Sequence, residues 1–197
     1  MQSKTLNNIA RIVKLDQRSA AWLAWRMGGL GASDMPIVLG VSPWRSPQEL
    51  WREKCGIAKP QAANWAMMRG VALEAEARLD YEFTTGNKVK PCCIERLDLP
   101  WMRASLDGIT RNGKIVVEIK VPGEADHLTA LSGFVPDKYI PQCDYLLVVS
   151  GAEVCHYYSY RYGEGALVEH YPDAARMDFM LAKAQEFWRS VLEFLSA

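Results

Sequence analysis

The most informative part of this sequence is Ser105-Leu106-Asp107-Gly108, followed after an Asn112-Gly113 turn by Val117-Glu118-Ile119-Lys120. Asn-Gly between two runs of alternating apolar residues is a strong short-range signal for a β-hairpin. A two-residue loop that pairs Arg111 with Lys114 aligns Asp107 directly opposite Glu118. Directly opposed residues have Cβ atoms about 4.5–5.5 Å apart, and like charges there are destabilising. The hairpin therefore predicts two carboxylates that are best tolerated with a cation between them.

Lys120 adds a positive charge to the same place, because it lies two residues after Glu118 and projects from the same face of the strand. Carboxylate oxygens favour Mg²⁺ or Mn²⁺. One or two such ions activate a water and stabilise the leaving oxygen of a phosphodiester, while a neighbouring lysine orients the water or neutralises developing charge. The residues thus point to phosphodiester hydrolysis. The alternative is a surface hairpin whose acids pair with nearby cations.

The composition is that of a globular protein with reduced thiols. With 197 residues, 49% of them hydrophobic, the chain can form one domain over residues 1–197 with a real core. No apolar run approaches the ~18 residues of a membrane span, and residues 1–14 lack the apolar centre of a signal peptide. We therefore expect a cytoplasmic protein that does not contact membranes. Five cysteines without a Cys-x-x-Cys pair predict free thiols, and three scattered histidines argue against zinc.

Charge is distributed unevenly, although the formal net charge is zero. Residues 1–60 hold nine Lys and Arg against four Asp and Glu, and the remainder holds 14 against 19. This asymmetry could place a basic face in the N-terminal part beside an acidic site in the rest. Ordinary scatter of charge is an equally weighted alternative.

Capping signals and periodicity divide the chain into helices and strands, as in an α/β fold. Ser19 is a candidate N-cap, and Ser46 opens a capping box with proline at the first helical position. Pro141 slightly favours helix over strand for residues 140–149. We expect helices at 19–27, 31–40 (opened by Ser33), 46–55, 65–83, 140–149 and from 173. We expect strands at 88–99, 102–110, 114–121 and 153–161, with a loop between 121 and 140.

Two of the expected helices carry apolar stripes. We expect the stripe of the C-terminal helix to lie in the core; it consists of Met177, Leu181, Ala184, Trp188, Val191 and Leu195. The helix at 65–83 repeats apolar residues every four positions along one flank, at Val71, Ala75, Leu79 and Phe83. Both stripes support helices over these residues.

Three further residues are candidates for a site. Glu74 sits mid-helix among small and apolar residues, where it could reach a metal or pair with Arg78 at i+4; the residues alone favour the pair. Arg26 and Ser33 could together hold a phosphate, since free N–H groups at a helix start favour an anion. Plain capping by Ser33 beside a solvated Arg26 is as well supported. The Gly-rich run at 28–31 lacks a Walker lysine, which argues against a nucleotide cradle.

Several of these motifs occur together and in a fixed order. The order is Leu30-Gly31-Ala32-Ser33-Asp34, Leu39-Gly40-Val41-Ser42-Pro43-Trp44, Ser46-Pro47-Gln48-Glu49-Leu50-Trp51, Gly70…Glu74, Ser105-Leu106-Asp107-Gly108 and Glu118-Ile119-Lys120. In this order, from about residue 18 to 149, the chain resembles the lambda-exonuclease-like (YqaJ-type) phage recombination nucleases of the PD-(D/E)xK superfamily. The resemblance implies a restriction-endonuclease-like core, with a central mixed β-sheet flanked by α-helices.

The resemblance also implies a role for each candidate residue. Metal ligands would be Asp107, Glu118, the Ile119 carbonyl and Glu74, with Lys120 assisting the water. The 5′-phosphate of a DNA end would bind Arg26 and Ser33, so that the helical part at about 1–60 contributes to DNA-end binding. Met67 and Met68 match an apolar wedge that parts the strands, with core methionines as the alternative. Gln142 matches the first position of a Gln-x-Gln helix motif, and Asp144, in place of its second glutamine, would add negative charge near the metals.

The activity that the resemblance implies is Mg²⁺-dependent digestion of linear duplex DNA from 5′ ends, with Mn²⁺ as a substitute and one or two ions bound. It would leave 3′ single strands for recombination by strand annealing. Implied partners are DNA ends, a single-strand annealing protein and further copies of the chain in a ring-shaped trimer, in the cytoplasm of a bacterial host. The alternatives are a structure-specific or restriction-type endonuclease on the same core, and a non-catalytic DNA-end-binding protein.

Overall fold

A seven-stranded mixed sheet forms the centre of the molecule, in a computed structural model that describes residues 5–60, 62 and 64–197. The strands lie side by side in chain order, and all neighbours are antiparallel except β5 and β6, which are parallel. The strands are β1 (Thr5–Leu6), β2 (Ala10–Val13), β3 (Val89–Arg96), β4 (Arg103–Thr110), β5 (Ile115–Lys120), β6 (Val154–Arg161) and β7 (Glu164–His170). The expected mixed sheet of an α/β protein is confirmed.

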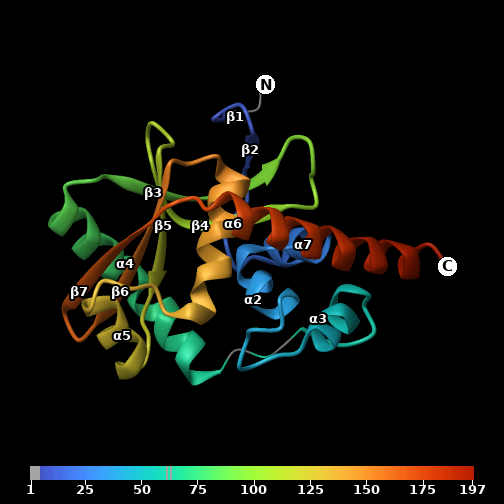
Figure 1. The fold of residues 1–197 in the computed structure, drawn as a ribbon, viewed down its shortest axis with the longest axis horizontal. Helices are drawn as coiled ribbons and strands as arrows, with labels where there is room; N and C mark the ends of the chain where they lie inside the picture. Colours follow the sequence, from blue (N-terminus) through green and yellow to red (C-terminus); the bar gives the residue numbers. More distant parts are fainter. Residues whose placement is uncertain (1–4, 61, 63) are drawn as a thin grey trace.

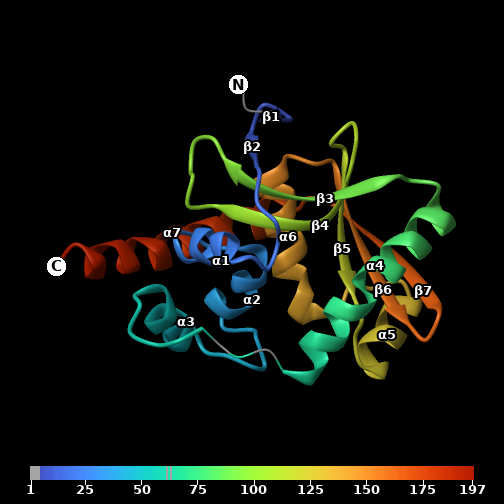
Figure 2. The same ribbon diagram turned by 180° about the vertical axis from the view of Figure 1, so that it is seen from behind.

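Helices cover both faces of this sheet. Figure 1 looks onto α6, which crosses the sheet, with α7 running away from it toward the C-terminus. Figure 2, seen from behind, shows α4 and α1 on the opposite face. The helices are α1 (Ala20–Met27), α2 (Met35–Val38), α3 (Pro47–Lys54), α4 (Trp65–Thr85), α5 (Glu124–Leu131), α6 (Ile140–Ser150) and α7 (Ala174–Leu195). Two 3₁₀ turns, Ala32–Asp34 and Asp137–Tyr139, precede α2 and α6.

Local capping chemistry explains where most helices begin. The Ser19 hydroxyl accepts a hydrogen bond from the Trp22 N–H at the start of α1. At α3 the reciprocal capping box is complete, because the Ser46 hydroxyl accepts from the Glu49 N–H and the Glu49 carboxylate accepts from the Ser46 N–H. These bonds satisfy N–H groups that the helix itself leaves free, so the predicted starts of these helices are confirmed.

The main core lies between the sheet and α6. This helix is buried along most of its length, and the Tyr145 hydroxyl donates to the Leu30 carbonyl at 2.7 Å. On the other face, Ala77 and Tyr81 of α4 pack against Val117 and Tyr158 of the sheet. The helix expected at 140–149 is therefore confirmed, and it lies against the strands that carry the candidate acids.

The apolar stripe of α7 is confirmed in its middle and wrong at its end. Ala184, Trp188 and Val191 are buried, whereas Leu195 is 57% exposed because the last turn extends beyond the sheet. Met180, which the stripe omits, is buried instead. The buried face of α7 is therefore slightly broader than the predicted apolar stripe.

The apolar flank of α4 faces solvent. Val71, Leu79 and Phe83 are 47%, 67% and 89% exposed, and the buried side of the helix is the one that carries Ala77 and Tyr81. Periodicity alone thus predicts the helix correctly and does not identify its packed face. The face of α4 that packs against the sheet is the one with Ala77 and Tyr81, which contact β5 and β6.

Other expectations are corrected by the structure. Strands β1, β2 and β7 have no counterpart in the sequence prediction, and α5 lies within the expected loop at 121–140. The helix expected at 31–40 is a 3₁₀ turn followed by the short α2, and the Asp34 carboxylate, rather than Ser33, accepts from the Gly31 N–H. Short elements are decided by long-range pairing, which sequence periodicity does not report.

The five cysteines are free, as expected, and four of them are buried. Within the described residues, no helix combines the length and the apolar character needed to cross a membrane. Residues 1–4, part of the N-terminal segment in which we expected no signal peptide, lie outside the described residues.

Candidate active site at the end of the β4–β5 hairpin

The β4–β5 hairpin has the expected register with a different turn. Gly108 pairs with Val117 and Ile109 with Val116, as the Asn-Gly signal predicts. The loop is wider than two residues, because the Gly113 N–H donates to the Thr110 carbonyl and the Thr110 hydroxyl accepts from the Ile115 N–H. Only Gly113, at φ +73°, is left-handed, whereas a two-residue type I′ turn needs two such residues. The expected pairing of Arg111 with Lys114 is therefore wrong.

A β-bulge in β4 sets the position of Asp107. Lys90 pairs with Ile109 and Cys92 pairs with Leu106, so that Pro91 alone faces both Asp107 and Gly108. Proline has no N–H to donate and is tolerated at a bulge, and bulges re-aim side chains. The pairing of β4 with β5 ends at Gly108, and one Asp107 carboxylate oxygen accepts the Ile119 N–H at 2.9 Å. Asp107 thus lies where β4 and β5 part, so the expected direct pairing of Asp107 with Glu118 is wrong, although the two acids remain close.

Glu118 is held from two directions. Its side chain is almost completely buried, and the same carboxylate oxygen accepts from the Lys120 amine and from the Gln142 amide, the latter at 2.6 Å. Gln142 comes from the first turn of α6, so this helix contacts the acidic strand directly. The structure therefore brings Asp107, Glu118, Lys120 and Gln142 together.

The electrostatics of this cluster are those of crowded like charges. Burial raises the pKa of Asp107 well above its usual value, and the charges of Glu118 and Glu74 raise it further against the opposing effect of Lys120. Burial disfavours the charged amine of Lys120, but Glu118 and Asp107 outweigh burial and raise the pKa of that amine. Within the hairpin one lysine faces the carboxylates of Asp107 and Glu118, and a bound cation would offset the repulsion between these two acids.

The Glu74 carboxylate is paired with two arginines. Its carboxylate forms ion pairs with Arg78 on the same helix and with Arg18, and the Arg78 guanidinium also donates to the Asp107 carbonyl at 2.7 Å. Arg18 adopts a left-handed backbone at φ +73°, which is uncommon for a residue with a side chain. Glu74 is thus next to the site through Arg78, and the i+4 pair with Arg78 that the residues favoured is present.

The donor set is suited to a hard divalent cation. Among the residues that the structure describes, no three His, Cys, Asp or Glu side chains meet in an arrangement that could hold a metal. The oxygens at this strand end come from the Asp107 and Glu118 carboxylates and from the Ile119 carbonyl. In an extended strand the C=O and N–H groups of one residue point toward the same neighbouring strand, so the Ile119 carbonyl points toward β4, as its N–H does. Carboxylate and carbonyl oxygens are ligands that Mg²⁺ and Mn²⁺ prefer.

Arg26 and Ser33, the predicted phosphate-binding residues, lie in contact with each other. The Arg26 guanidinium donates to the Ser33 hydroxyl at 2.9 Å, lies 4.9 Å from the centre of the Trp22 ring and is 3.8 Å from the Asp34 carboxylate. The Trp22 indole N–H donates to the hydroxyl of Ser105 at 2.7 Å, two residues before Asp107. Helix α1 is thereby fixed to the strand that carries the acid, and Arg26 lies on the same helix.

Not all of the N-terminal basic residues are available to a ligand. Lys54 is buried and bonds to Asp34, to the Gly29 carbonyl at 2.7 Å and to the Arg26 carbonyl at 3.0 Å. A side chain at Gly29 would collide with the Trp101 carbonyl, since its Cβ would lie 2.3 Å from that oxygen. The Gly-rich run therefore permits close backbone packing rather than forming a nucleotide cradle.

Met67 and Met68 lie on the surface, in the first turns of α4. They are 49% and 51% exposed, beside Trp65 at 77%. The alternative that they are core methionines is wrong. Their exposure keeps them available for the wedge role that the resemblance implies.

Asp144 lies on the other side of α6 from Gln142. Two residues along a helix turn the side chain by about 200°. The Asp144 carboxylate accepts from His170 of β7 at 2.7 Å and from Arg176 of α7 at 2.8 Å, and it is nearly inaccessible to solvent. The expectation that Asp144 adds negative charge near the metals is wrong, because these two partners bind it in the interior.

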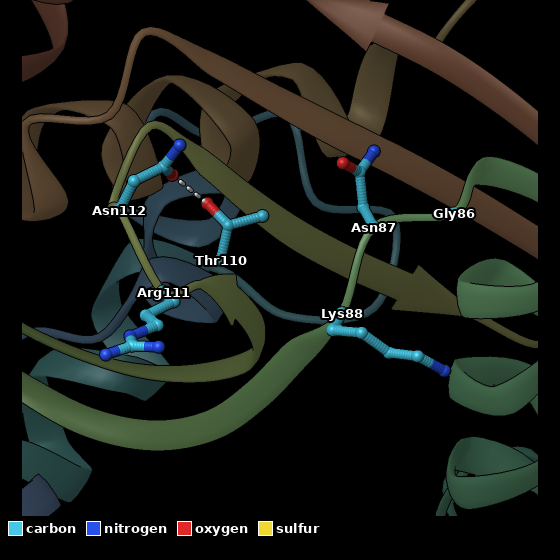
Figure 3. A pocket seen from close by; sticks show the side chains of 6 residues that line it. All are labelled: Gly86, Asn87, Lys88, Thr110, Arg111 and Asn112. Carbon is cyan, nitrogen blue, oxygen red and sulfur yellow. Dashed lines mark hydrogen bonds between the residues drawn. The ribbon is translucent and has the colours of Figure 1, made fainter.

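Surface shape does not identify the site. A hollow of about 560 Å³ lies at the turn end of the hairpin (Figure 3). At its wall the Thr110 hydroxyl donates a hydrogen bond to the Asn112 side-chain oxygen. Its lining consists of Gly86, Asn87, Lys88, Thr110, Arg111 and Asn112. None of these residues belongs to the acidic cluster at the other end of the strands, where the chemistry is concentrated.

Sequence reasoning missed four contributors to the site: Arg18, Arg78 as a partner of Asp107, Ser105 and Tyr139. The Lys120 amine lies 5.3 Å from the centre of the Tyr139 ring. Arg18, Ser105 and Tyr139 make their contacts between distant segments, which no local pattern marks. Arg78 had a partial signal, because its i+4 spacing from Glu74 was visible in the sequence.

Comparisons with known proteins identify a matching family model and a curated relative. The model of the YqaJ-like viral recombinase domain matches residues 21–153. The uncharacterized protein YqaJ of Bacillus subtilis (strain 168) is 28% identical over 173 residues, which are 85% of this chain and 54% of that protein. The chain thus spans about half the length of this curated relative.

Two solved structures share the fold. The alkaline exonuclease LHK-Exo from Laribacter hongkongensis superposes with a TM-score of 0.79 at 24% identity, over 90% of this chain and 95% of that one. A phage related exonuclease from Haemophilus somnus 129PT superposes with a TM-score of 0.61 at 12% identity, over 84% of this chain and 95% of that one. At these identities the similarity establishes the fold.

Proposed function

Because the chain belongs to the YqaJ-like viral recombinase domain family, we propose that it is a Mg²⁺-dependent exodeoxyribonuclease acting on linear duplex DNA. The family and the exonuclease-like fold support a nuclease. The observation that carries the proposal is the cluster of Asp107, Glu118 and Lys120 at the end of one hairpin. A buried glutamate, a half-buried aspartate and a lysine are groups that can support metal-assisted phosphodiester hydrolysis.

Each residue of the cluster has a proposed task. Asp107, Glu118 and the Ile119 carbonyl hold one or two Mg²⁺ ions, or Mn²⁺ in their place. A bound ion supplies Lewis acidity for the attacking water and the leaving oxygen. Lys120 orients the water or stabilises charge that develops on the phosphate. Gln142 fixes the Glu118 carboxylate, and Glu74, held by two arginines, adds its charge beside Asp107.

The proposed polarity of digestion rests on the positions of Arg26 and Ser33. We propose that Arg26 and Ser33 bind the 5′-phosphate of a DNA end, so that the enzyme digests from 5′ ends and leaves 3′ single strands. The contact between the guanidinium and the hydroxyl supports this, because both groups donate hydrogen bonds to phosphate oxygens. Met67 and Met68, exposed at the start of α4, part the strands ahead of the site.

The proposed partners are DNA ends, a single-strand annealing protein and further copies of the chain in a ring-shaped trimer, as the family resemblance implies. Light scattering of the purified protein tests the last of these. A mass of one chain at working concentrations contradicts the trimer and leaves the nuclease proposal intact.

Digestion of one linear duplex, labelled at its 5′ or its 3′ ends, tests the proposal with Mg²⁺ and with a chelator. We expect rapid release of the 5′ label, slow release of the 3′ label and no release with chelator. Release from the 3′ end first contradicts the polarity. Binding without hydrolysis indicates an end-binding protein, and rapid cutting of covalently closed circles indicates an endonuclease.

A further inference from the structure

Three aromatic rings form a ladder from the sheet to the surface. Tyr157 of β6 is fully buried, and the Tyr139 ring stacks on it with 5.7 Å between ring centres and 28° between planes. The Trp44 ring follows, 6.4 Å from Tyr139 and tilted by 33°. The ladder therefore begins in the core and ends at a ring in the loop between α2 and α3.

The ladder adjoins the acidic cluster. Tyr157 is the register partner of Glu118 in the parallel β5–β6 pair. The Lys120 amine lies 5.3 Å from the centre of the Tyr139 ring. The outer end of the ladder is therefore separated from the Lys120 amine by one ring, that of Tyr139.

A second cation accompanies the outer rings. The Lys138 amine lies 5.0 Å from the Trp44 ring centre and 5.4 Å from that of Tyr139. Asp126 of α5 fixes this amine at 2.8 Å and accepts from the Tyr139 hydroxyl at 3.4 Å. Lysine amines beside aromatic faces are the combination that binds single strands, in which bases stack and phosphates meet positive charge.

Trp44 leaves much of its ring to solvent. It is 58% exposed, although tryptophan is one of the residues that gains most from burial. The Trp44 backbone N–H donates to the Ser42 hydroxyl at 3.3 Å, and the Tyr139 ring and the Lys138 amine lie beside the Trp44 ring. The outer end of the ladder is thus an open aromatic surface on an ordered support.

We propose that Trp44 stacks on a nucleobase of the DNA strand that enters the acidic cluster. The inference rests on the proposed function and deepens it, because it names the part of the substrate that this surface recognises. Stacking on an aromatic ring is tolerant of sequence, since every base has a π-face. The Lys138 amine beside the Trp44 ring contacts a phosphate of the same strand. The Lys120 amine lies beside Tyr139, the next ring toward the acidic cluster.

Binding of two oligonucleotides of equal length, one of thymidines and one abasic, tests the inference in the presence of chelator, so that the strand stays intact. We expect Trp44→Ala to weaken binding of the thymidine strand by about 5- to 150-fold, the range for removing a base-stacking ring. Binding of the abasic strand stays unchanged, because that strand has no base to stack. Trp44→Phe, which retains a ring, recovers most of the affinity.

Phe179→Ala is the matched control, because Phe179 of α7 is 59% exposed and lies outside the ladder. It leaves the binding of both strands unchanged, and melting curves verify that all variants are folded. The inference is overturned by any of three results: Trp44→Ala binds thymidines as the parent does, it loses the same factor on the abasic strand, or the parent binds neither strand.

The binding assay is independent of hydrolysis. A parent protein that shows the Trp44 effect in chelator and never cleaves DNA with Mg²⁺ contradicts the proposed function and retains the stacking site. Cleavage by a parent whose strand binding does not depend on Trp44 contradicts only the stacking site.

Discussion

At the scale of single residues, the two carboxylates of the hairpin share one nearby lysine, whereas the arginines of the site pair with Glu74. Lys120 is the one lysine of the β4–β5 hairpin that contacts Glu118, and its charge also opposes that of Asp107. Lys114, at the turn end of the same hairpin, pairs with Glu153 on the surface. Two lysines six residues apart therefore have separate surroundings, which makes them a matched pair for mutation.

Lys120→Ala is expected to lower the rate of hydrolysis at least about 100-fold, because it removes the group that stabilises developing charge. DNA binding, which the proposal assigns mainly to other residues, stays largely intact. Rates on a labelled duplex and affinities in chelator are the two measurements. Lys114→Ala retains the parent's rate, and a Lys120→Ala protein that hydrolyses like the parent refutes the site assignment.

Arg26→Ala is expected to reduce the preference for 5′-phosphorylated over 5′-hydroxyl ends, because it removes the guanidinium beside Ser33. The measurement is the ratio of initial rates on two duplexes that differ only in the terminal phosphate. Arg189→Ala, at an exposed position on α7, is the control and retains the parent's ratio. Equal ratios in parent and Arg26→Ala exclude Arg26 from the phosphate site.

At the scale of elements, α6 connects the acidic cluster to the C-terminal part of the chain. Gln142 on one side donates to Glu118, and Asp144 on the other binds His170 and Arg176. The helix is thereby attached to β5, β7 and α7 at once. Its orientation sets the direction of the Gln142 amide, so loosening the Asp144 contacts affects the acid that Gln142 holds.

Asp144→Asn is expected to lower the free energy of unfolding at pH 7 by about 2 kcal/mol, because hydrogen bonds to a charged group are lost. Burial favours the protonated form of Asp144, but His170 and Arg176 outweigh burial and lower the pKa of its carboxyl. The stabilisation is therefore complete above the unfolded pKa of about 3.9 and disappears as the pH falls through the lower folded pKa.

Denaturation of parent and Asp144→Asn across pH provides the measurement. The difference between their unfolding free energies should be constant near neutrality and shrink below about pH 4. Asp178→Asn, at an exposed position on α7, serves as the control. A difference that persists unchanged in acid contradicts the assignment of the effect to the Asp144 carboxylate.

At the scale of the whole molecule, the fold brings acids from two strands and a helix to one end of the sheet. The stability of the folded chain should therefore respond to divalent cations, because a ligand that binds only the folded state stabilises it. We expect saturating Mg²⁺ to raise the melting temperature by about 5–10 °C, for an occupancy near 100 Kd in a domain of this size. Chelator should reverse the rise.

Asp107→Asn is the discriminating variant. Its amide oxygen can still accept the Ile119 N–H, so the strand end is retained while one like charge is removed. We expect this variant to melt at or above the parent's temperature without cation and to show little response to Mg²⁺. An equal rise in both proteins contradicts a cation site at Asp107.

The sequence determined the features that depend on neighbours along the chain. The Ser46 capping box, the long α4 and the register of the β4–β5 hairpin were all predictable, because caps, periodicity and turn residues act within a few positions. The same local logic predicted that Asp107 and Glu118 lie close together, although the β4–β5 pairing ends at Gly108, before Asp107. It also suggested the pair of Glu74 with Arg78, one turn apart on α4.

Only the tertiary structure decided which faces meet. The bulge opposite Pro91 redirects Asp107, Arg18 reaches Glu74 from a distant segment, and Asp144 turns away from the acids toward Arg176. The stripe of α4 faces solvent, and Trp44 reaches the site through Tyr139. These arrangements depend on burial and pairing between remote segments, and local propensity carries no information about a partner a hundred residues away.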